Sequence, residues 1–211
     1  MIKHSIQKTI PVLAGYVFLG SAFGILVESQ GLSIWVALFM SLFIYAGSMQ
    51  FAAVSLIMNP ISLIQTFILA LSINARHLFY GVSMLKPFQK AGNKKYYMVF
   101  GLTDESFSLI INEDDHVTMY QIILLNQIYW LIGTVLGFYF GKVIPFPTTG
   151  IEFAMTALFL VIFVDKLKEK RYYPSFVGIV VSVVCLLIFK SQYFIIPSMI
   201  GIVLGLSKEA F

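Results

Sequence analysis

Residues 10–27 read IPVLAGYVFLGSAFGILV, an apolar run that contains no charged side chain. Its length is close to the roughly 20 residues that an α-helix needs to cross about 30 Å of hydrocarbon. Lys3, His4 and Lys8 precede the run, as basic residues precede the apolar core of a cleaved secretory signal. Because several similar runs follow, we interpret residues 10–27 as a retained first transmembrane helix.

The composition of the whole chain predicts an integral membrane protein. Of its 211 residues 59% are hydrophobic and 11% are charged, whereas a soluble domain has about 25% charged residues. The net charge of +4 comes from short basic clusters between apolar runs, which argues against nucleic-acid binding. With Cys185 as its single cysteine, the chain can form no internal disulfide.

The apolar runs predict an all-α fold, because they are longer than barrel strands and lack the alternation of such strands. We expect a polytopic transmembrane helical bundle of about seven hydrophobic helices, forming a single domain over residues 1–211. The runs are residues 10–27, 34–57, 61–85, 97–112, 117–141, 151–164, 174–189 and 193–206.

Basic side chains at the ends of the runs predict which segments face the cytoplasm. They cluster at the N-terminus and at residues 86–95 and 166–171, whereas residues 113–115 are acidic and are expected outside. Residues 34–85 must then cross the membrane an odd number of times. The span that ends at Gly141 should return to the inside, yet the short run 151–164 must also place Lys166 inside, so something there does not cross fully.

We therefore infer broken or re-entrant helices within residues 34–85 and 142–164, interrupted at Gly47, at Asn59-Pro60 and at Pro145-Phe146-Pro147. Irregular backbone at membrane depth is tolerated only against protein or a water-filled cavity, so these breaks point toward a substrate site. The alternative is that the basic loops violate the usual pattern, or that the boundaries of the runs are misplaced.

Ionisable side chains inside the runs mark candidate functional positions, because a charge near the bilayer centre costs about 2.5–3.5 kcal/mol on insertion scales. Residues 72–81 contain Asn74, Arg76 and His77. Arg76 could clamp a carboxylate, and His77 could carry a proton. The alternative is a helix end at the membrane surface, from which Arg76 reaches the headgroups.

Asp104 and Glu105 form a second ionisable group. They could line an aqueous path, or they could stand in the first turn of a helix that Thr103 or Asp104 caps. The two interpretations are compatible where a half-helix begins inside a cavity. Glu152 also lies near a predicted helix start, where ordinary capping electrostatics would explain it.

Small and polar residues mark two further features. Tyr45, Ser48 and Gln50 interrupt the second run, which suits an unwound helix whose free carbonyls could coordinate an ammonium group. Glycines four residues apart predict close helix packing, either inside the bundle or against another subunit. They are Gly20/Gly24, Gly133/Gly137/Gly141 and Gly201/Gly205.

Catalytic and metal-binding motifs are absent from the sequence. It contains no HExxH, no GxSxG, no Gly-rich phosphate loop and no cysteine cluster, and its three histidines lie far apart. We therefore predict neither an enzyme nor a bound metal or cofactor. Without an ATPase motif, any transport would be driven by a gradient or by another chain.

Four stretches together resemble the AzlC-type branched-chain amino-acid permease family, the larger component of a two-subunit exporter. They are YAGSMQF (45–51), NARHLFY (74–80), GLTDESF (101–107) and EFAMTALF (152–159). The order and spacing of these stretches extend the resemblance over most of the chain. Met49 departs from the family pattern, which has a small residue, usually Ala, at this position. This difference could alter the shape of a pocket and therefore the substrate.

The resemblance implies export of hydrophobic amino acids such as valine, leucine, isoleucine or methionine. It also implies a multi-pass protein of a bacterial-type cell membrane and a small hydrophobic AzlD-type partner subunit. The N- and C-termini are expected in the cytoplasm.

We hypothesise alternating access around a pocket at the membrane midplane. Arg76 or a half-helix N-terminus would hold the substrate carboxylate, and Asp104 or Glu105 would face its ammonium group. The substrate-binding candidates are Tyr45, Ser48, Gln50, Asn74, Arg76, Asp104 and Glu105. The candidates for coupling a proton are His77, Asp104, Glu105 and Glu152.

Two other functional classes stay open. A non-transporting membrane scaffold would pair its polar groups with protein and carry no flux. A channel-like pore would give flux that neither saturates nor shows counterflow. An intramembrane hydrolase is disfavoured because its motifs are absent.

Overall fold

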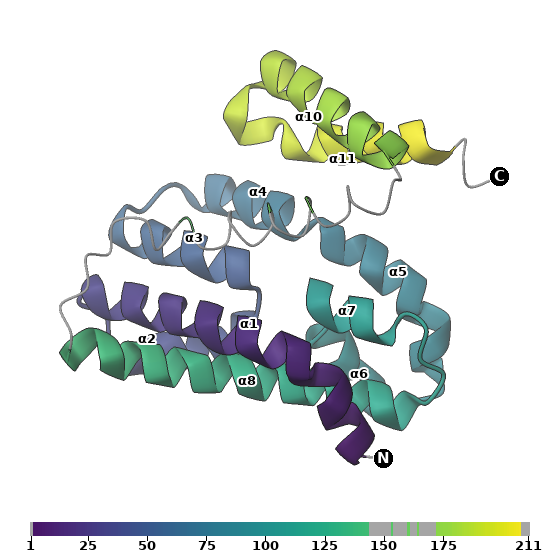
Figure 1. Ribbon diagram of the computed structural model, residues 1–211. Coiled ribbons are helices and arrows are strands. Elements are labelled where there is room, and N and C mark those ends of the chain that lie inside the picture. The colour runs from purple at the N-terminus through teal and green to yellow at the C-terminus, as the bar shows by residue number, and fades with distance from the viewer. Residues whose placement is uncertain (1, 144–152, 154–159, 161–163, 165–171, 208–211) are drawn as a thin grey trace. The chain divides into compact units, whose positions relative to one another are not determined.

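The computed structural model describes residues 2–143, 153, 160, 164 and 172–207, and every regular element in these ranges is a helix (Figure 1). The all-α prediction is confirmed for this part of the chain. In chain order the elements are α1 (Ile2–Ser29), α2 (Ile34–Phe39), the π-helix η1 (Met40–Ile44), α3 (Gly47–Met58), α4 (Leu63–Asn74), α5 (Arg76–Gln89), α6 (Lys94–Phe100), α7 (Asp104–Ile110), α8 (His116–Val143), α10 (Tyr172–Tyr193) and α11 (Ile195–Ser207).

Three of the described helices are long and apolar enough to cross a membrane, namely α1, α8 and most of α10. The successive helices α4 and α5 add a fourth span if they count as one broken span. The expected number of about seven is not confirmed, because the runs 34–57 and 97–112 are each divided into short helical segments.

Two of the predicted interruptions are confirmed. Helix η1 ends at Ile44 and α3 begins at Gly47, and α3 ends at Met58, directly before Asn59 and Pro60. The predicted break at residues 145–147 lies outside the described residues.

The chain divides into two compact units. The first contains residues 1–60 and 76–155, and the second contains residues 61–75 and 156–211. In the second unit α10 and α11 form an antiparallel pair, in which Gly201 lies against the side chain of Val181. The expected single domain over the whole chain stays a prediction.

The first unit is built on α1 and α8, whose backbones are in contact. A Cβ atom at Gly20 would lie 2.7 Å from the carbonyl oxygen of Trp130, and one at Gly133 would lie 2.7 Å from that of Val17. Side chains do not tolerate such distances, so these glycines allow the two helices to approach closely. Gly24 and Gly137 meet the opposite backbone in the same way.

Helices α1 and α8 run in the same direction (Figure 1). Ser5 bonds Gln121 near their first turns, and Glu28 lies beside Gly141 near their last turns. We call the end that holds Ser5 and Gln121 the N-side of the pair, and the end that holds Glu28 and Gly141 the C-side.

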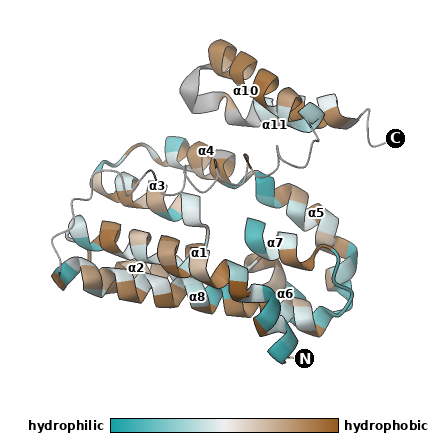
Figure 2. Cartoon of the chain, in the orientation of Figure 1, coloured by the Kyte–Doolittle hydropathy of each residue, from teal (hydrophilic) through white to brown (hydrophobic). Residues whose placement is uncertain are grey.

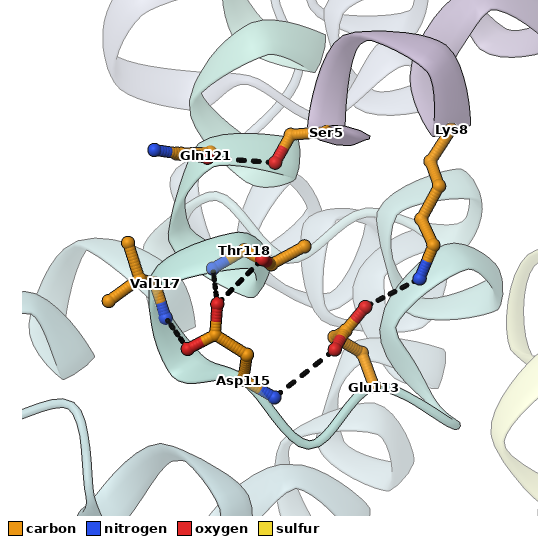
Figure 3. A network of polar contacts seen from close by, with 7 residues as sticks. All are labelled: Ser5, Lys8, Glu113, Asp115, Val117, Thr118 and Gln121. Atoms are coloured by element: carbon orange, nitrogen blue, oxygen red, sulfur yellow. Dashed lines mark hydrogen bonds and ion pairs between the residues drawn. The ribbon is translucent and has the colours of Figure 1, made fainter. Parts of the chain in front are cut away.

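Polar contacts connect the chain segments at the N-side (Figure 3). Ser5 Oγ donates to Gln121 Oε1 at 2.8 Å, and Lys8 Nζ lies 2.5 Å from Glu113 Oε2. The expectation that the acidic turn at residues 113–115 lies opposite the N-terminus is therefore wrong. The physical reason is that acidic residues contribute little to membrane orientation, and here Lys8 pairs with one of them.

Helices α6 and α7 form a hairpin that enters from the N-side. Lys94 Nζ lies 4.9 Å from the centre of the Tyr120 ring, close to the start of α8. At the tip of the hairpin, Thr103 Oγ1 lies 2.6 Å from Tyr16 Oη, halfway along α1. Helix α7 then leads back to Glu113 at the N-side.

The reversal in this hairpin has a local cause. Helix α6 ends at Gly101, and Thr103 adopts an extended conformation in which its side chain accepts a hydrogen bond from the backbone N–H of Ser106 at 3.2 Å. This N-cap starts a new helix in a new direction. The interpretation of residues 97–112 as one helix is therefore wrong.

A second hairpin, made of α2, η1 and α3, enters from the C-side. Helix α2 begins shortly after α1 ends, and Phe51 of α3 packs against Phe23 in the C-side half of α1 with ring centres 5.7 Å apart. At the tip, the ring centre of Tyr45 lies 6.4 Å from that of Phe100 at the end of α6. Two hairpins thus enter from opposite ends, and their tips meet halfway along α1 and α8.

Gly137→Ala should destabilise the protein, because the new methyl group would overlap the backbone of Ser21. We expect a loss of about 1–3 kcal/mol, as for other overpacked sites, measured as a lower melting temperature in detergent. Gly15→Ala is the matched control, since nothing lies within 4 Å of its added methyl group. Equal melting temperatures for the two variants would contradict the backbone contact.

The contact between Lys8 and Glu113 should contribute stability that depends on pH. The hydrogen bond from Lys8 holds the pKa of Glu113 below its ordinary value. Such a carboxylate stabilises the fold above its unfolded-state pKa of about 4.3 and loses this contribution as pH falls through its lower folded-state pKa. Glu113→Gln should therefore lower the melting temperature at pH 7, and this effect should become smaller as the pH is lowered below about 4.3. A loss that stays the same size as the solution is acidified would exclude this account.

Candidate functional site

Three helices of the first unit begin near the tips of the hairpins. They are α3 at Gly47, α5 at Arg76 and α7 at Asp104. In Figure 2 the first turns of α5 and α7 are hydrophilic, whereas α1 and α8 are mainly hydrophobic along most of their length. Polar groups are therefore gathered inside an apolar bundle.

Arg76 connects the two hairpins. Its Nη1 lies 2.5 Å from Asp104 Oδ2 of α7, and its Nη2 donates to Ser48 Oγ of α3 at 3.0 Å. The side chains of Arg76 and Asp104 are only 26% and 21% exposed. The alternative in which Arg76 reaches the lipid headgroups does not agree with this geometry.

Glu105 follows Asp104 but has a different partner. The hydroxyl of Tyr16 on α1 donates to Glu105 Oε2 at 2.8 Å and also contacts Thr103 Oγ1. Thr103 caps α7, so the capping interpretation is confirmed for this residue. Asp104 and Glu105 face neighbouring elements, which is compatible with a lining role for the two carboxylates.

Tyr45 holds the tip of the other hairpin in an unusual conformation. Its φ of 41° and ψ of 41° lie in the left-handed region, which is rare for a bulky residue and costs about 1–3 kcal/mol. The side chain is 4% exposed, and its hydroxyl has no hydrogen-bond partner among the described residues. Strain and a buried polar group at one position are typical of functional sites.

Buried polar side chains connect the C-side hairpin to α8. Gln50 Nε2 donates to Ser41 Oγ at 3.0 Å, and Ser41 Oγ lies 3.0 Å from Thr134 Oγ1. All three side chains are fully buried. Gln50 is one of the substrate-binding candidates, but in this structure the nitrogen of its amide is bonded to Ser41.

A matching contact connects the N-side hairpin to α8. Asn126 Nδ2 donates to Ser106 Oγ at 3.0 Å, and Tyr97 Oη donates to Gln127 Oε1 at 2.5 Å.

The sequence patterns did not single out Asn126 and Gln127 of α8, nor Tyr16, Ser41 and Thr134. Two consecutive amides in the middle of an apolar run were the available signal, because buried amides at membrane depth require partners.

The other candidates lie elsewhere. His77 follows Arg76 on α5, and its ring packs edge-on against Tyr80 with centres 5.9 Å apart. Asn74 belongs to α4 in the second unit, where its amide donates to the carbonyl of Ala70 at 3.0 Å. Glu152 lies outside the described residues.

The charges at the hairpin tips do not balance. Arg76 pairs with Asp104, whereas Glu105 has no ion-pair partner in the described ranges. An unpaired carboxylate at membrane depth is unfavourable, so this arrangement suits a further cation, such as a proton or an ammonium group. No three His, Cys, Asp or Glu residues lie together as a possible metal site in the part of the chain that the structure describes.

The chain is similar to a group of membrane proteins. A family model described as "AzlC protein" matches residues 11–144. The "Branched-chain amino acid transport protein AzlC" of Bacillus subtilis is 43% identical over 95% of this chain and 82% of its own length. An uncharacterized membrane protein of Haemophilus influenzae is 40% identical over 98% of this chain and 88% of its own length.

A more distant relative is the "Inner membrane protein YgaZ" of Escherichia coli. It is 27% identical over 78% of this chain and 73% of its own length. No solved structure gives a significant match to the chain.

Thr103→Val should destabilise the protein by about 1 kcal/mol, because valine cannot accept the hydrogen bond that caps α7 or bond Tyr16. Thr103→Ser keeps the hydroxyl and should retain most of the stability. Melting temperatures of the two purified variants in detergent test this. If the two variants have the same melting temperature, the side-chain cap does not stabilise the hairpin.

Proposed function

Since this chain belongs to the AzlC family, we propose that it exports branched-chain and related hydrophobic L-amino acids, such as valine, leucine, isoleucine and methionine. The name of the Bacillus subtilis relative, a branched-chain amino acid transport protein, supports this substrate class and supports a transporter rather than an enzyme. Export proceeds by alternating access, is driven by an ion gradient, and requires a small hydrophobic AzlD-type membrane subunit. Both termini face the cytoplasm.

The observation that carries this proposal is the contact of Arg76 with both hairpins. Ser48 belongs to the hairpin that enters from the C-side, and Asp104 belongs to the one that enters from the N-side. Helices that are interrupted at membrane depth are typical of transporter substrate sites. A group that binds Arg76 in place of Asp104 would loosen the connection between the two hairpins.

An amino-acid zwitterion has the charges that this site can use. Its carboxylate would bind the Arg76 guanidinium, which suits planar carboxylates. Its ammonium group would face Asp104 or Glu105. Tyr45, Ser48 and Gln50 are the further binding candidates in the first unit, and His77, Asp104, Glu105 and Glu152 are the candidates for coupling a proton.

The opposed direction of the hairpins supports alternating access. Movement of the α6–α7 hairpin would open the site toward the N-side, and movement of the α2–α3 hairpin would open it toward the C-side. Helices α1 and α8 would stay fixed, because their glycine contacts leave no room for sliding.

A non-transporting scaffold is the second candidate function. It is favoured by the fact that Arg76, Asp104 and Glu105 all have protein partners in this structure. Vesicles separate the two functions, because a scaffold predicts no counterflow of labelled leucine. A pore predicts flux that does not saturate.

Arg76→Ala should abolish efflux of radiolabelled leucine from loaded cells that express the chain with its AzlD-type partner. The variant removes the cation that would bind the substrate carboxylate. Arg76→Lys keeps the charge but not the planar donor pair, so we expect a reduced rate. The amount of protein in the membrane is measured in parallel.

Lys90→Ala is the matched control for this experiment. Lys90 is exposed in the loop after α5, so removal of its charge should leave efflux unchanged. Undiminished efflux from cells with Arg76→Ala would refute the assigned role of Arg76.

A further inference from the structure

Asp104 and Glu105 are consecutive carboxylates in different surroundings. Asp104 lies 2.5 Å from Arg76 and is neutralised by it. Glu105 is bonded by the neutral hydroxyl of Tyr16 at 2.8 Å. The two residues are therefore not interchangeable, and the negative charge that lacks a counter-ion belongs to Glu105.

The groups that face Glu105 supply no second cation. Among the described residues, the charged and titratable groups around it are Asp104 on α7, Arg76 and Tyr80 on α5, Tyr16 on α1 and Tyr45 at the opposite hairpin tip. Helix α8 faces the same hairpin with the neutral amide of Asn126, and Tyr97 of α6 lies near Tyr45. Glu105 can thus become neutral only by taking up a cation that comes from outside the site.

A second observation indicates that this place accepts a ligand. The Tyr45 hydroxyl at the tip of the opposite hairpin is buried and has no hydrogen-bond partner in the described part of the chain. Unsatisfied buried oxygens are rare in proteins and are expected to be satisfied in another state of the site.

From this arrangement we infer that Glu105 carries the coupling proton and that substrate binding beside it expels this proton, so that the protein is a proton/amino-acid antiporter. The inference rests on the proposed transport function and assigns separate roles to the two carboxylates. Asp104 exchanges its partner Arg76 for the substrate ammonium group, while Glu105 alternates between its protonated and ionised forms.

The exclusion between proton and substrate follows from the position of Glu105. When the substrate carboxylate binds Arg76 and its ammonium group binds Asp104, the positive end of the zwitterion lies next to Glu105. A nearby positive charge favours the ionised carboxylate. The proton leaves Glu105 to the water on the open side, and a proton from the other side returns to Glu105 after the substrate has been released there. One proton is exchanged for one amino acid.

Proteoliposomes that contain the chain and its AzlD-type partner test this inference. With the membrane potential clamped and the interior more acidic by one pH unit, a one-to-one antiporter can accumulate labelled leucine about tenfold. We expect the wild type to approach this ratio. Glu105→Gln should retain counterflow of labelled against unlabelled leucine but should show no accumulation above the external concentration.

Two variants serve as comparisons. Glu28→Gln removes a carboxylate beside Gly141 at the C-side and should accumulate leucine like the wild type. Tyr16→Phe removes the hydroxyl that donates a hydrogen bond to Glu105 and leaves the charge of the site unchanged. Without this bond the carboxylate should hold its proton to a higher pH. The pH above which leucine uptake driven by an acidic interior stops should therefore rise by about one unit. This shift also tests the inference if Glu105→Gln does not fold.

The outcomes separate this inference from the proposed function. Wild-type accumulation by Glu105→Gln, an unchanged pH profile for Tyr16→Phe, or loss of coupling only in His77→Gln would overturn the assignment of Glu105. Accumulation only with an alkaline interior would overturn antiport. If the wild type shows no counterflow, the transport function itself fails.

Discussion

The parallel backbone contact between α1 and α8 is the constraint on which the first unit depends. Gly20, Gly24, Gly133 and Gly137 let the two helices approach until each touches the backbone of the other. In lipid such close packing replaces the hydrophobic effect as the force between helices. Because both helices run from the N-side to the C-side, the chain between them must return once. Each hairpin begins and ends at the same side. The chain must therefore pass from the C-side back to the N-side within residues 59–93.

The hairpins are stabilised by hydrogen bonds to the backbone groups at the helix ends near their tips. A half-helix at membrane depth exposes backbone groups that lipid cannot satisfy. The Leu42 carbonyl near the end of η1 accepts from Gln127 Nε2 at 3.2 Å, and Thr103 caps the first turn of α7. The amide of Gln127 also accepts from Tyr97 of α6, so a single side chain of α8 connects to both hairpins.

Much of this arrangement could be predicted from the sequence, and the rest could not for identifiable reasons. Hydropathy predicted the all-α fold, and the odd number of crossings before residue 86 agrees with the contacts of Lys8 and Lys94 at one side. A helix start at Thr103 was among the interpretations of the sequence. The reversal of direction between α6 and α7 was not, because a capping residue does not determine the direction of the helix that follows it. The ion pair of Arg76 with Asp104 joins residues that are 28 positions apart, a proximity that only the tertiary fold determines.

An ion pair between the hairpin tips also determines which ligands could separate them. Breaking a buried pair by removing one partner costs about 3–5 kcal/mol, because a charge is left without compensation. A simple carboxylic acid could replace Asp104 at Arg76 but would leave Asp104 unpaired, and a simple amine would leave Arg76 unpaired. A zwitterion replaces both partners at once, and its side chain is then free to contact the apolar faces around the tips. The polar contacts of the site would therefore select the amino-acid backbone, and the surrounding hydrophobic residues would select the side chain.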